Sequence, residues 1–151
     1  MKDTTLSGDI AEWQVAAALI RAGKKLLRPV SGASRYDLVI DNEDGTFTRV
    51  QCKAGRLRNG RIEFRVYSMS GHRGTRGRRY DGQVDAFGIY CPGTQKSYLV
   101  PMAELAGHVG AACLRVDPAR NGQVKRTRQA VDFVIGDTNP SEGPGAPAAR
   151  P

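Results

Sequence analysis

Apolar residues recur at intervals of three and four positions near the start of the chain, at Ile10, Trp13, Ala17 and Ile20. This spacing predicts a helix over residues 8–23 that packs these side chains as one stripe. Gly23 suits the C-terminal end of the helix, because glycine readily adopts the left-handed backbone that often follows a last turn.

Glu12 falls in the first turn of this predicted helix, three residues after Asp9. The two acids have the spacing of a capping box, and a glutamate favours the positive end of the helix dipole. At this point a purely structural role for Glu12 and a role in a functional site are both open.

Two short apolar runs, residues 36–41 and 47–53, flank a polar segment that contains Asp44-Gly45. Alternating runs around such a turn predict a β-hairpin. Because side chains alternate between the faces of a strand, Asp37 shares a face with Val39 and Asp41. On the second strand the corresponding set is Arg49, Gln51 and Lys53.

The length of the turn decides whether these two sets lie on the same side of the sheet. Cross-strand partners point to the same side. A two-residue turn at Asp44-Gly45 would place Asp37 opposite Cys52 and away from Gln51 and Lys53. An odd loop or a single bulge brings them together, and a three-residue loop with Gly45 in the left-handed region satisfies this condition.

The remaining pattern predicts a mixed sheet of four to six strands with the N-terminal helix against one face, an α/β architecture. In residues 61–68, Ile62, Phe64 and Val66 alternate with charged residues and are expected to face the core. A basic turn is expected over residues 55–60. Further strands are expected over residues 26–30, 83–91, 96–100 and 113–116, and short helices over 101–105 and 129–134.

Composition predicts one domain over residues 1–135 and a disordered, Pro/Gly-rich tail over residues 136–151. A basic flexible arm is expected at residues 71–79, whose glycines and arginines cannot pack a core. The chain has no apolar run near the ~20 residues of a membrane helix and begins without an apolar signal region, so we expect a cytoplasmic protein. The scattered Cys52, Cys91 and Cys113 indicate buried thiols rather than a disulfide framework or a zinc site.

The positive charge is concentrated in one segment. The chain carries a formal charge of +8, and residues 49–79 contain ten Lys or Arg but a single acid, Glu63, a local balance of +9. Concentrated charge of this kind suits a polyanionic partner. The alternative is a basic face that serves solubility, but the segment adjoins the hairpin described above.

Asp37, Gln51 and Lys53 offer a carboxylate, an amide carbonyl and an amine. Each residue alone has an ordinary explanation: a solvated acid, a polar residue on a sheet face and a charge at a strand end. Together on one predicted face, beside the basic segment, they favour a metal-assisted nuclease site.

With Glu12, Asp37 and Gln51-x-Lys53 in this order, the chain resembles the PD-(D/E)xK nuclease superfamily, and within it the homing endonucleases encoded by bacterial group I introns. The resemblance extends over about residues 6–134. Tyr36 stands where the superfamily name has proline, and Gln51 replaces an acid, as that branch allows. Further matching motifs are Val84-Asp85-x-Phe87, Tyr90-Cys91-Pro92, Tyr98-Leu99-Val100-Pro101, and Leu114-Arg115 with Asn121-x-Gln123.

The resemblance implies a restriction-endonuclease-like fold and a role for each site residue. Asp37, the side chain of Gln51 and the main-chain carbonyl of Cys52 would bind Mg²⁺, with Mn²⁺ able to substitute. Lys53 would orient the attacking water, and Glu12 would act through water on the metal. We hypothesise that Glu12 partly compensates for the charge that Gln51 lacks.

The expected substrate is double-stranded DNA, cut by a homodimer or homotetramer, since one small subunit holds one site. A structure-selective nuclease resembling Holliday junction resolvases and a non-catalytic DNA-binding protein on the same scaffold are the alternatives. The residues expected to contact DNA are Arg35, Arg56, Arg58, Arg61, Arg65, Ser68, Arg73, Arg76, Arg78, Arg79, Lys125 and Arg126.

Overall fold

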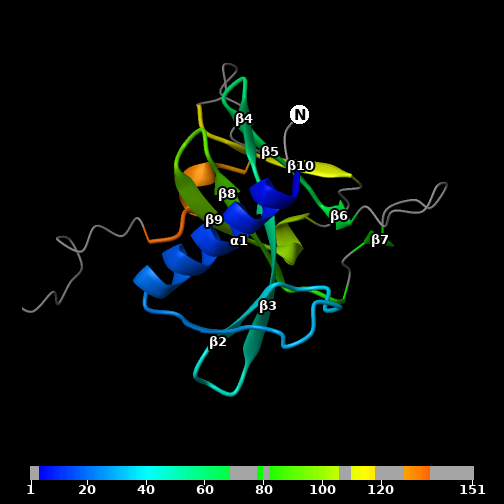
Figure 1. Ribbon diagram of the computed structural model, residues 1–151. Helices are drawn as coiled ribbons and strands as arrows, with labels where there is room; N and C mark the ends of the chain where they lie inside the picture. The colour runs from blue at the N-terminus through cyan, green and yellow to red at the C-terminus, as the bar shows by residue number, and fades with distance from the viewer. Residues whose placement is uncertain (1–3, 69–77, 80–81, 106–109, 118–127, 137–151) are drawn as a thin grey trace, which may run out of the picture.

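A computed structural model of the 151-residue chain describes residues 4–68, 78–79, 82–105, 110–117 and 128–136 (Figure 1). A five-stranded sheet in the order β1-β2-β3-β8-β9 forms its centre. The strands are β1 (Lys25–Leu27), β2 (Leu38–Asp41), β3 (Phe47–Ala54), β8 (Ala86–Cys91) and β9 (Lys96–Pro101). Only β3 and β8 run parallel in this sheet. The expected mixed sheet is therefore confirmed.

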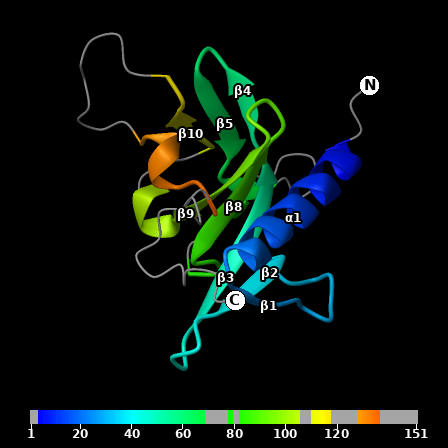
Figure 2. The same ribbon diagram turned by 90° about the vertical axis from the view of Figure 1, so that its left-hand side faces the viewer.

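The helix α1 (Thr4–Arg21) covers one face of this sheet. Figure 2 shows α1 on one side of β3 and β8, and β10 (Ala111–Arg115) with the short helical turns on the other. These turns are 3₁₀ helices, η1 (Met102–Leu105) and η2 (Ala130–Asp132). Under α1 a core forms from Val15, Ala16, Leu19, Leu38, Ile40, Val50, Cys52 and Ala86. Two buried clusters therefore sandwich the sheet.

The second cluster lies beneath a three-stranded sheet in the order β10-β5-β4. It contains Ile62, Phe64 and Val66, the three residues whose alternation predicted a buried face. The strands β4 (Arg56–Arg58) and β5 (Arg61–Arg65) form a hairpin. The prediction of a plain turn over residues 55–60 is therefore wrong. Asn59 and Gly60 both have positive φ, 49° and 71°, and Asn-Gly is the sequence that favours such a two-residue hairpin turn.

The face that α1 buries differs from the predicted one. Ala11, Val15, Ala18 and Leu19 are buried, whereas Ile10, Trp13 and Ile20 of the predicted stripe are 43%, 62% and 61% exposed. The cause is close packing on β8, where a Cβ atom at Gly88 would lie 2.6 Å from Val15 Cγ1. The helix therefore turns its smaller side chains toward the sheet.

The position at which α1 begins rules out the capping role considered for Glu12. Since the helix begins at Thr4, Glu12 and Asp9 lie in its interior and have no capping role. The expected C-terminal end at Gly23 is confirmed by a φ of 83°. The N–H of Gly23 bonds the carbonyl of Ile20, and that of Lys24 bonds the carbonyl of Leu19, which is a Schellman motif.

The β2–β3 hairpin has the register that the sequence argument required. Leu38 pairs with Val50 and Asp41 with Phe47, and the N–H of Asn42 bonds the carbonyl of Thr46 over 3.1 Å. The turn proper is therefore Glu43-Asp44-Gly45, and Gly45 has a φ of 89°. The expected three-residue loop is confirmed.

Several predictions fall partly or wholly outside the described residues. Of the expected arm at residues 71–79, the structure describes only β7 (Arg78–Arg79), which pairs with β6 (Tyr67–Ser68). Residues 118–127 and the expected tail from residue 137 onward are not described. In the described part of the chain, no helix is both long and apolar enough to span a membrane.

Candidate active site

Asp37 lies immediately before β2, at the point where the pairing of β2 with β3 ends. Its main-chain N–H donates to the carbonyl of Val50 over 2.9 Å. The N–H of Cys52 donates to Asp37 Oδ2 over 2.8 Å. The Asp37 carboxylate thus accepts the N–H of a β3 residue that lies past the last β2–β3 pair, Leu38 with Val50. This hydrogen bond fixes the carboxylate against β3.

The register brings Gln51 and Lys53 to the side of the sheet that Asp37 shares. Val50 and Cys52 of β3 are buried under α1, while Gln51 and Lys53, which alternate with them, are half-buried. Leu38 is opposite Val50, so in the same register Asp37 precedes it on the side of Gln51. The geometric condition for a shared site is met.

The pKa of Asp37 is raised by burial, and three interactions oppose this effect. The hydrogen bond from Cys52 is the largest of them, followed by the positive charges of Lys53 and Arg28. The charge of this carboxylate is costly to bury, but a main-chain donor holds it and an amine faces it. Such an arrangement is typical of a site that binds a cation or performs chemistry.

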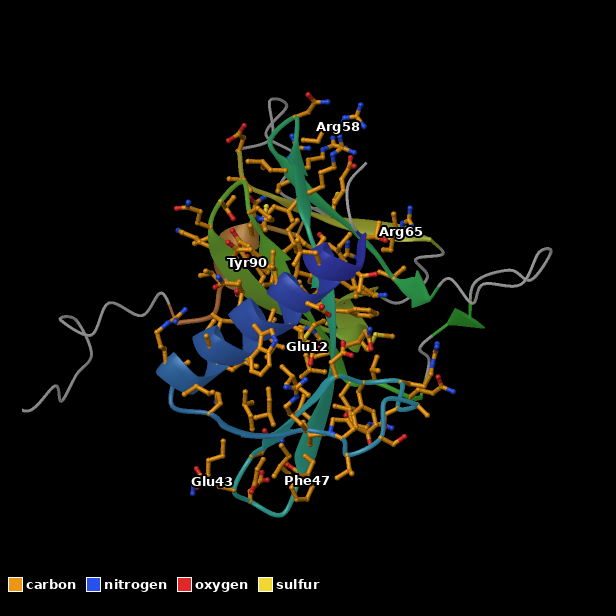
Figure 3. All side chains as sticks on the ribbon, viewed as in Figure 1. Glu12, Glu43, Phe47, Arg58, Arg65 and Tyr90 are labelled. Atoms are coloured by element: carbon orange, nitrogen blue, oxygen red, sulfur yellow. The ribbon has the colours of Figure 1, made fainter. Side chains whose placement is uncertain are left out.

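Glu12 approaches the same site from the helix. Figure 3 shows Glu12 where α1 passes over β3. Burial raises the pKa of Glu12, and the negative charge of Asp37 raises it further. The carboxylates of Glu12 and Asp37 therefore repel each other across the site, and a bound cation would relieve this repulsion.

Arg28 lies beside the candidate site, and the sequence did not indicate it. It follows β1, and its guanidinium forms an ion pair with Glu12. The same group lies 4.7 Å from the ring centroid of Trp13 on α1. Its positive charge lowers the pKa of Glu12 against the effect of burial. Arg28 belongs to no periodic pattern and no motif in the sequence. Its contact with α1 follows only from the packing of β1 beside α1.

Cys52 can contribute its main chain but not its thiolate. Burial raises the pKa of the Cys52 thiol, and the negative charges of Asp37 and Glu12 raise it further. The side chain is therefore a neutral thiol. The N–H and C=O of one strand residue point to the same edge of the strand. Because the Cys52 N–H points to Asp37, its carbonyl lies along the edge on which Asp37 sits.

These donors suit a hard divalent cation. Asp37, the amide of Gln51 and the carbonyl of Cys52 offer oxygen, the ligand atom that Mg²⁺ prefers. In the described ranges no three His, Cys, Asp or Glu residues gather as a metal cluster. The candidate set does not need one, since two of its three ligands are an amide and a main-chain carbonyl.

The expected DNA-contacting residues lie in several separate parts of the chain. Arg56, Arg58, Arg61 and Arg65 are exposed and share one face of the β4–β5 hairpin, with Glu63 among them. We call these four residues the arginine face; Figure 3 shows Arg58 at the hairpin tip and Arg65 at the far end of β5.

The other expected contacts lie elsewhere. Arg35 donates to Gln83 Oε1 over 2.6 Å. Ser68 lies in β6 and Arg78 and Arg79 in β7, while Arg73, Arg76, Lys125 and Arg126 fall outside the described residues.

Comparison with a solved structure supports the fold. The bacterial homing endonuclease I-Ssp6803I superposes with a TM-score of 0.69 over 88% of this chain and 89% of its own, at 22% sequence identity. Comparison with curated protein sequences gives no match.

A family model described as PD-(D/E)XK endonuclease matches residues 2–135. The match includes Glu12, Asp37, Gln51 and Lys53, and the mixed sheet with its N-terminal helix is the fold found in that structural neighbour. The chain therefore belongs to the PD-(D/E)XK endonuclease family.

Proposed function

We propose that this protein is a Mg²⁺-dependent DNA endonuclease that cuts double-stranded DNA at specific sites. One observation carries the proposal: the hydrogen bond from Cys52 holds the Asp37 carboxylate on the side of Gln51 and Lys53. Membership of an endonuclease family supports the reaction class. The homing endonuclease among its structural neighbours supports, by analogy, cleavage at specific sites.

Each residue has a defined part in phosphodiester hydrolysis. Asp37, Gln51 and the Cys52 carbonyl would hold the metal, with Mn²⁺ as a substitute. When bound, Mg²⁺ polarises the phosphate and lowers the pKa of water. Lys53 orients the attacking water and neutralises charge that develops on the phosphate. A water oxygen would bond to phosphorus as one P–O ester bond breaks, and the proton released by that water would reach the leaving oxygen through solvent.

Glu12 would act from the helix side of the site. Its carboxylate lies close enough to Asp37 for their charges to interact, and Arg28 holds it by an ion pair. From this position it can accept hydrogen bonds from water beside the metal. It also adds the negative charge that the neutral Gln51 lacks.

The arginine face would bind the phosphate backbone. Arg58 and Arg61 are direct cross-strand partners beside the hairpin turn, and like charges in that position destabilise a hairpin. A phosphate between them would remove this repulsion. Contacts of this kind position the DNA but do not read its sequence.

The test is cleavage of three DNA substrates with Mg²⁺, Mn²⁺ and chelator: plasmid, linear duplex and a four-way junction. Discrete plasmid fragments that need the metal and vanish in Lys53→Ala are expected. Lys96→Ala, an exposed lysine of β9, is the matched control and should cut normally. Cleavage of the junction alone would replace the homing assignment with a resolvase. DNA binding with no cleavage of any substrate would refute the enzyme.

A further inference from the structure

The outward side of the three-stranded sheet β10-β5-β4 carries three arginines in one line across its strands (Figure 2). Arg61 on β5 pairs with Arg58 on β4 and with Arg115 on β10. Cross-strand partners point to the same side of a sheet. This side faces away from the core, because Ile62 and Leu114, which are adjacent in sequence to Arg61 and Arg115, are buried. We call Arg58, Arg61 and Arg115 the cross-strand row.

The cross-strand row lacks an acid to balance it. Like charges directly opposite each other destabilise a sheet. In the next row Arg56 is opposite Glu63, which is a pair of opposite charge. Asp117 lies against the hairpin turn, where a Cβ atom at Gly60 would be 2.4 Å from Asp117 Oδ2. Among the described residues, neither Asp117 nor any other acid forms an ion pair with a member of the cross-strand row.

Arg115 provides a second observation. Its Nε is buried and has no hydrogen-bond partner in the described chain. Its neighbours across the strands are Arg61 and Gln129, and neither is an acid. A buried N–H without a partner is unfavourable, and a guanidinium forms its strongest hydrogen bonds with a carboxylate or a phosphate. The hydrogen-bonding capacity of Arg115 is therefore unused within the described chain.

We propose that the cross-strand row binds one phosphodiester group of a DNA backbone, with Arg115 as the third contact, an assignment that rests on the proposed function. Neighbouring strands lie ~4.8 Å apart, so the backbones of Arg58 and Arg115 are separated by about 10 Å. Side chains from both outer strands can converge on one phosphate above Arg61. The phosphate oxygens accept hydrogen bonds from the guanidinium groups, and the negative charge removes the repulsion within the row.

One duplex can contact both the cross-strand row and the candidate site. The chain stays extended past β3, because the N–H of Gly55 bonds the carbonyl of Tyr90 over 2.7 Å. Arg58 follows Lys53 by five residues, and five extended residues span at most ~18 Å. One DNA strand carries a charge for every ~3.4 Å of helix axis, so this span covers about five nucleotides. The row would therefore anchor a second phosphate, about half a helical turn from the scissile one.

The first test follows the arginine Nε–H resonances while inorganic phosphate is titrated at constant ionic strength with chelator present. Arg115→Lys identifies the signal of Arg115 by its disappearance. We expect this signal to shift and to saturate. The shift should be the same in Lys53→Ala, since Lys53 belongs to the candidate site and not to the row. A signal that phosphate leaves unmoved in either protein overturns the proposal.

The stability of Arg115→Gln separates anion binding from a structural role. At low salt without phosphate, its denaturant midpoint should equal or exceed that of the wild type, because one of three adjacent like charges is gone. Phosphate should raise the midpoint of the wild type more than that of the variant. A lower midpoint without phosphate, combined with a response to phosphate equal to that of the wild type, would make Arg115 a structural residue and overturn the proposal.

Duplex binding over a salt series tests the assignment to the DNA backbone. Arg115→Gln should weaken binding to any duplex about tenfold, as expected for one lost charged hydrogen bond, and lower the slope of log K against log salt by ~1. Asp117→Asn should strengthen binding, since it removes a negative charge beside the row. Arg21→Gln, in the last turn of α1, is the control and should change neither quantity. Unchanged binding by Arg115→Gln, or an effect seen only with a 5′-phosphate at the duplex end, overturns the assignment.

These measurements need no DNA cleavage. Absence of cleavage together with the expected Arg115 responses would refute the proposed nuclease activity and leave the cross-strand row standing as a phosphate site. Normal cleavage together with an unresponsive Arg115 would refute the row and leave the nuclease standing.

Discussion

The Asp37 carboxylate accepts a hydrogen bond from the main-chain N–H of Cys52 over 2.8 Å, one residue before the lysine whose charge it also faces. This bond joins the acid of one strand to the backbone of the next. It holds a partly buried negative charge in place, and the positive charges of Lys53 and Arg28 also act on that carboxylate. The cost of that arrangement is visible in the raised pKa of Asp37.

Asp37→Asn should abolish cleavage and leave the fold intact. The asparagine oxygen can still accept the Cys52 N–H, but the negative charge proposed to bind the metal is lost. Because a bound metal supplies several kcal/mol of transition-state stabilisation, we expect single-turnover cleavage to fall by at least ~10²-fold. Asp132→Asn, an exposed acid of η2, is the control. Cleavage within a few-fold of wild type in Asp37→Asn would rule out Asp37 as a metal ligand.

The metal-free protein should become less stable as the pH rises through the acid range. The folded-state pKa values of Asp37 and Glu12 are raised above 3.8 and 4.5. The folded state therefore holds these protons more tightly than the unfolded state, and stability is lost as the pH rises through the folded pKa values. At neutral pH Asp37→Asn should unfold at higher denaturant concentration than wild type. An equal or lower midpoint without metal would contradict this prediction.

Arg28 should tune the pH dependence of the reaction through Glu12. Its charge lowers the pKa of Glu12 against burial and the charge of Asp37. Removing it in Arg28→Ala should raise that pKa and move the acid limb of the pH–rate profile to higher pH. Arg28→Lys should restore part of the shift. A uniform fall in rate with an unmoved acid limb would mean that Arg28 serves only the structure.

Arg49 and Asp85 should contribute modestly to the stability of the β3–β8 junction. Arg49 Nε and Nη2 each lie 3.0 Å from an oxygen of Asp85, and the Arg49 N–H donates to the same carboxylate over 2.8 Å. The pair is partly exposed, so Asp85→Asn should cost only ~1 kcal/mol of unfolding free energy.

The stability difference between wild type and Asp85→Asn should depend on pH. The hydrogen bonds from Arg49 lower the pKa of Asp85 below 3.8. This contribution is therefore present above pH 3.8 and is lost as the pH falls through the folded-state value. Glu43→Gln, which breaks the exposed Lys25–Glu43 pair, is the control and should have almost no effect. A difference that stays constant into strong acid would refute the role of the ionised pair.

The arginine face should contribute salt-dependent DNA affinity. Arg58→Ala should weaken binding to any duplex and reduce the slope of log K against log salt by ~1, the value for one lost phosphate contact. Lys25→Ala, on the edge strand β1 of the five-stranded sheet, should leave the slope unchanged. An unaltered slope in Arg58→Ala would exclude that arginine from the backbone contact.

The sequence predicted the hairpin better than the helix, for a physical reason. The condition that Asp37 share a face with Gln51 and Lys53 required an odd loop or a bulge, and Gly45 supplies the left-handed backbone of the three-residue loop. Both features lie within the hairpin itself. The orientation of α1 is not local. The helix has two apolar faces, and the absence of a side chain at Gly88 decides which one meets the sheet. No pattern within residues 4–21 contains that information.

Arg28 illustrates the same limit within the candidate site. Asp37, Gln51 and Lys53 could be proposed together from the sequence, because a strand fixes the faces of its own residues. Arg28 lies in an exposed connection and acquires its role from two α1 residues, Glu12 and Trp13, more than ten positions away. Its partnership follows from the tertiary arrangement alone.

The three-residue turn of the β2–β3 hairpin restricts how this gene can change. A residue added between Glu43 and Gly45 has to be absorbed as a longer loop or a bulge, because a shift of the pairing by one residue would turn Asp37 away from Gln51 and Lys53. Two added codons would preserve the alternation. Natural length changes in this hairpin are therefore expected to keep the pairing of Leu38 with Val50.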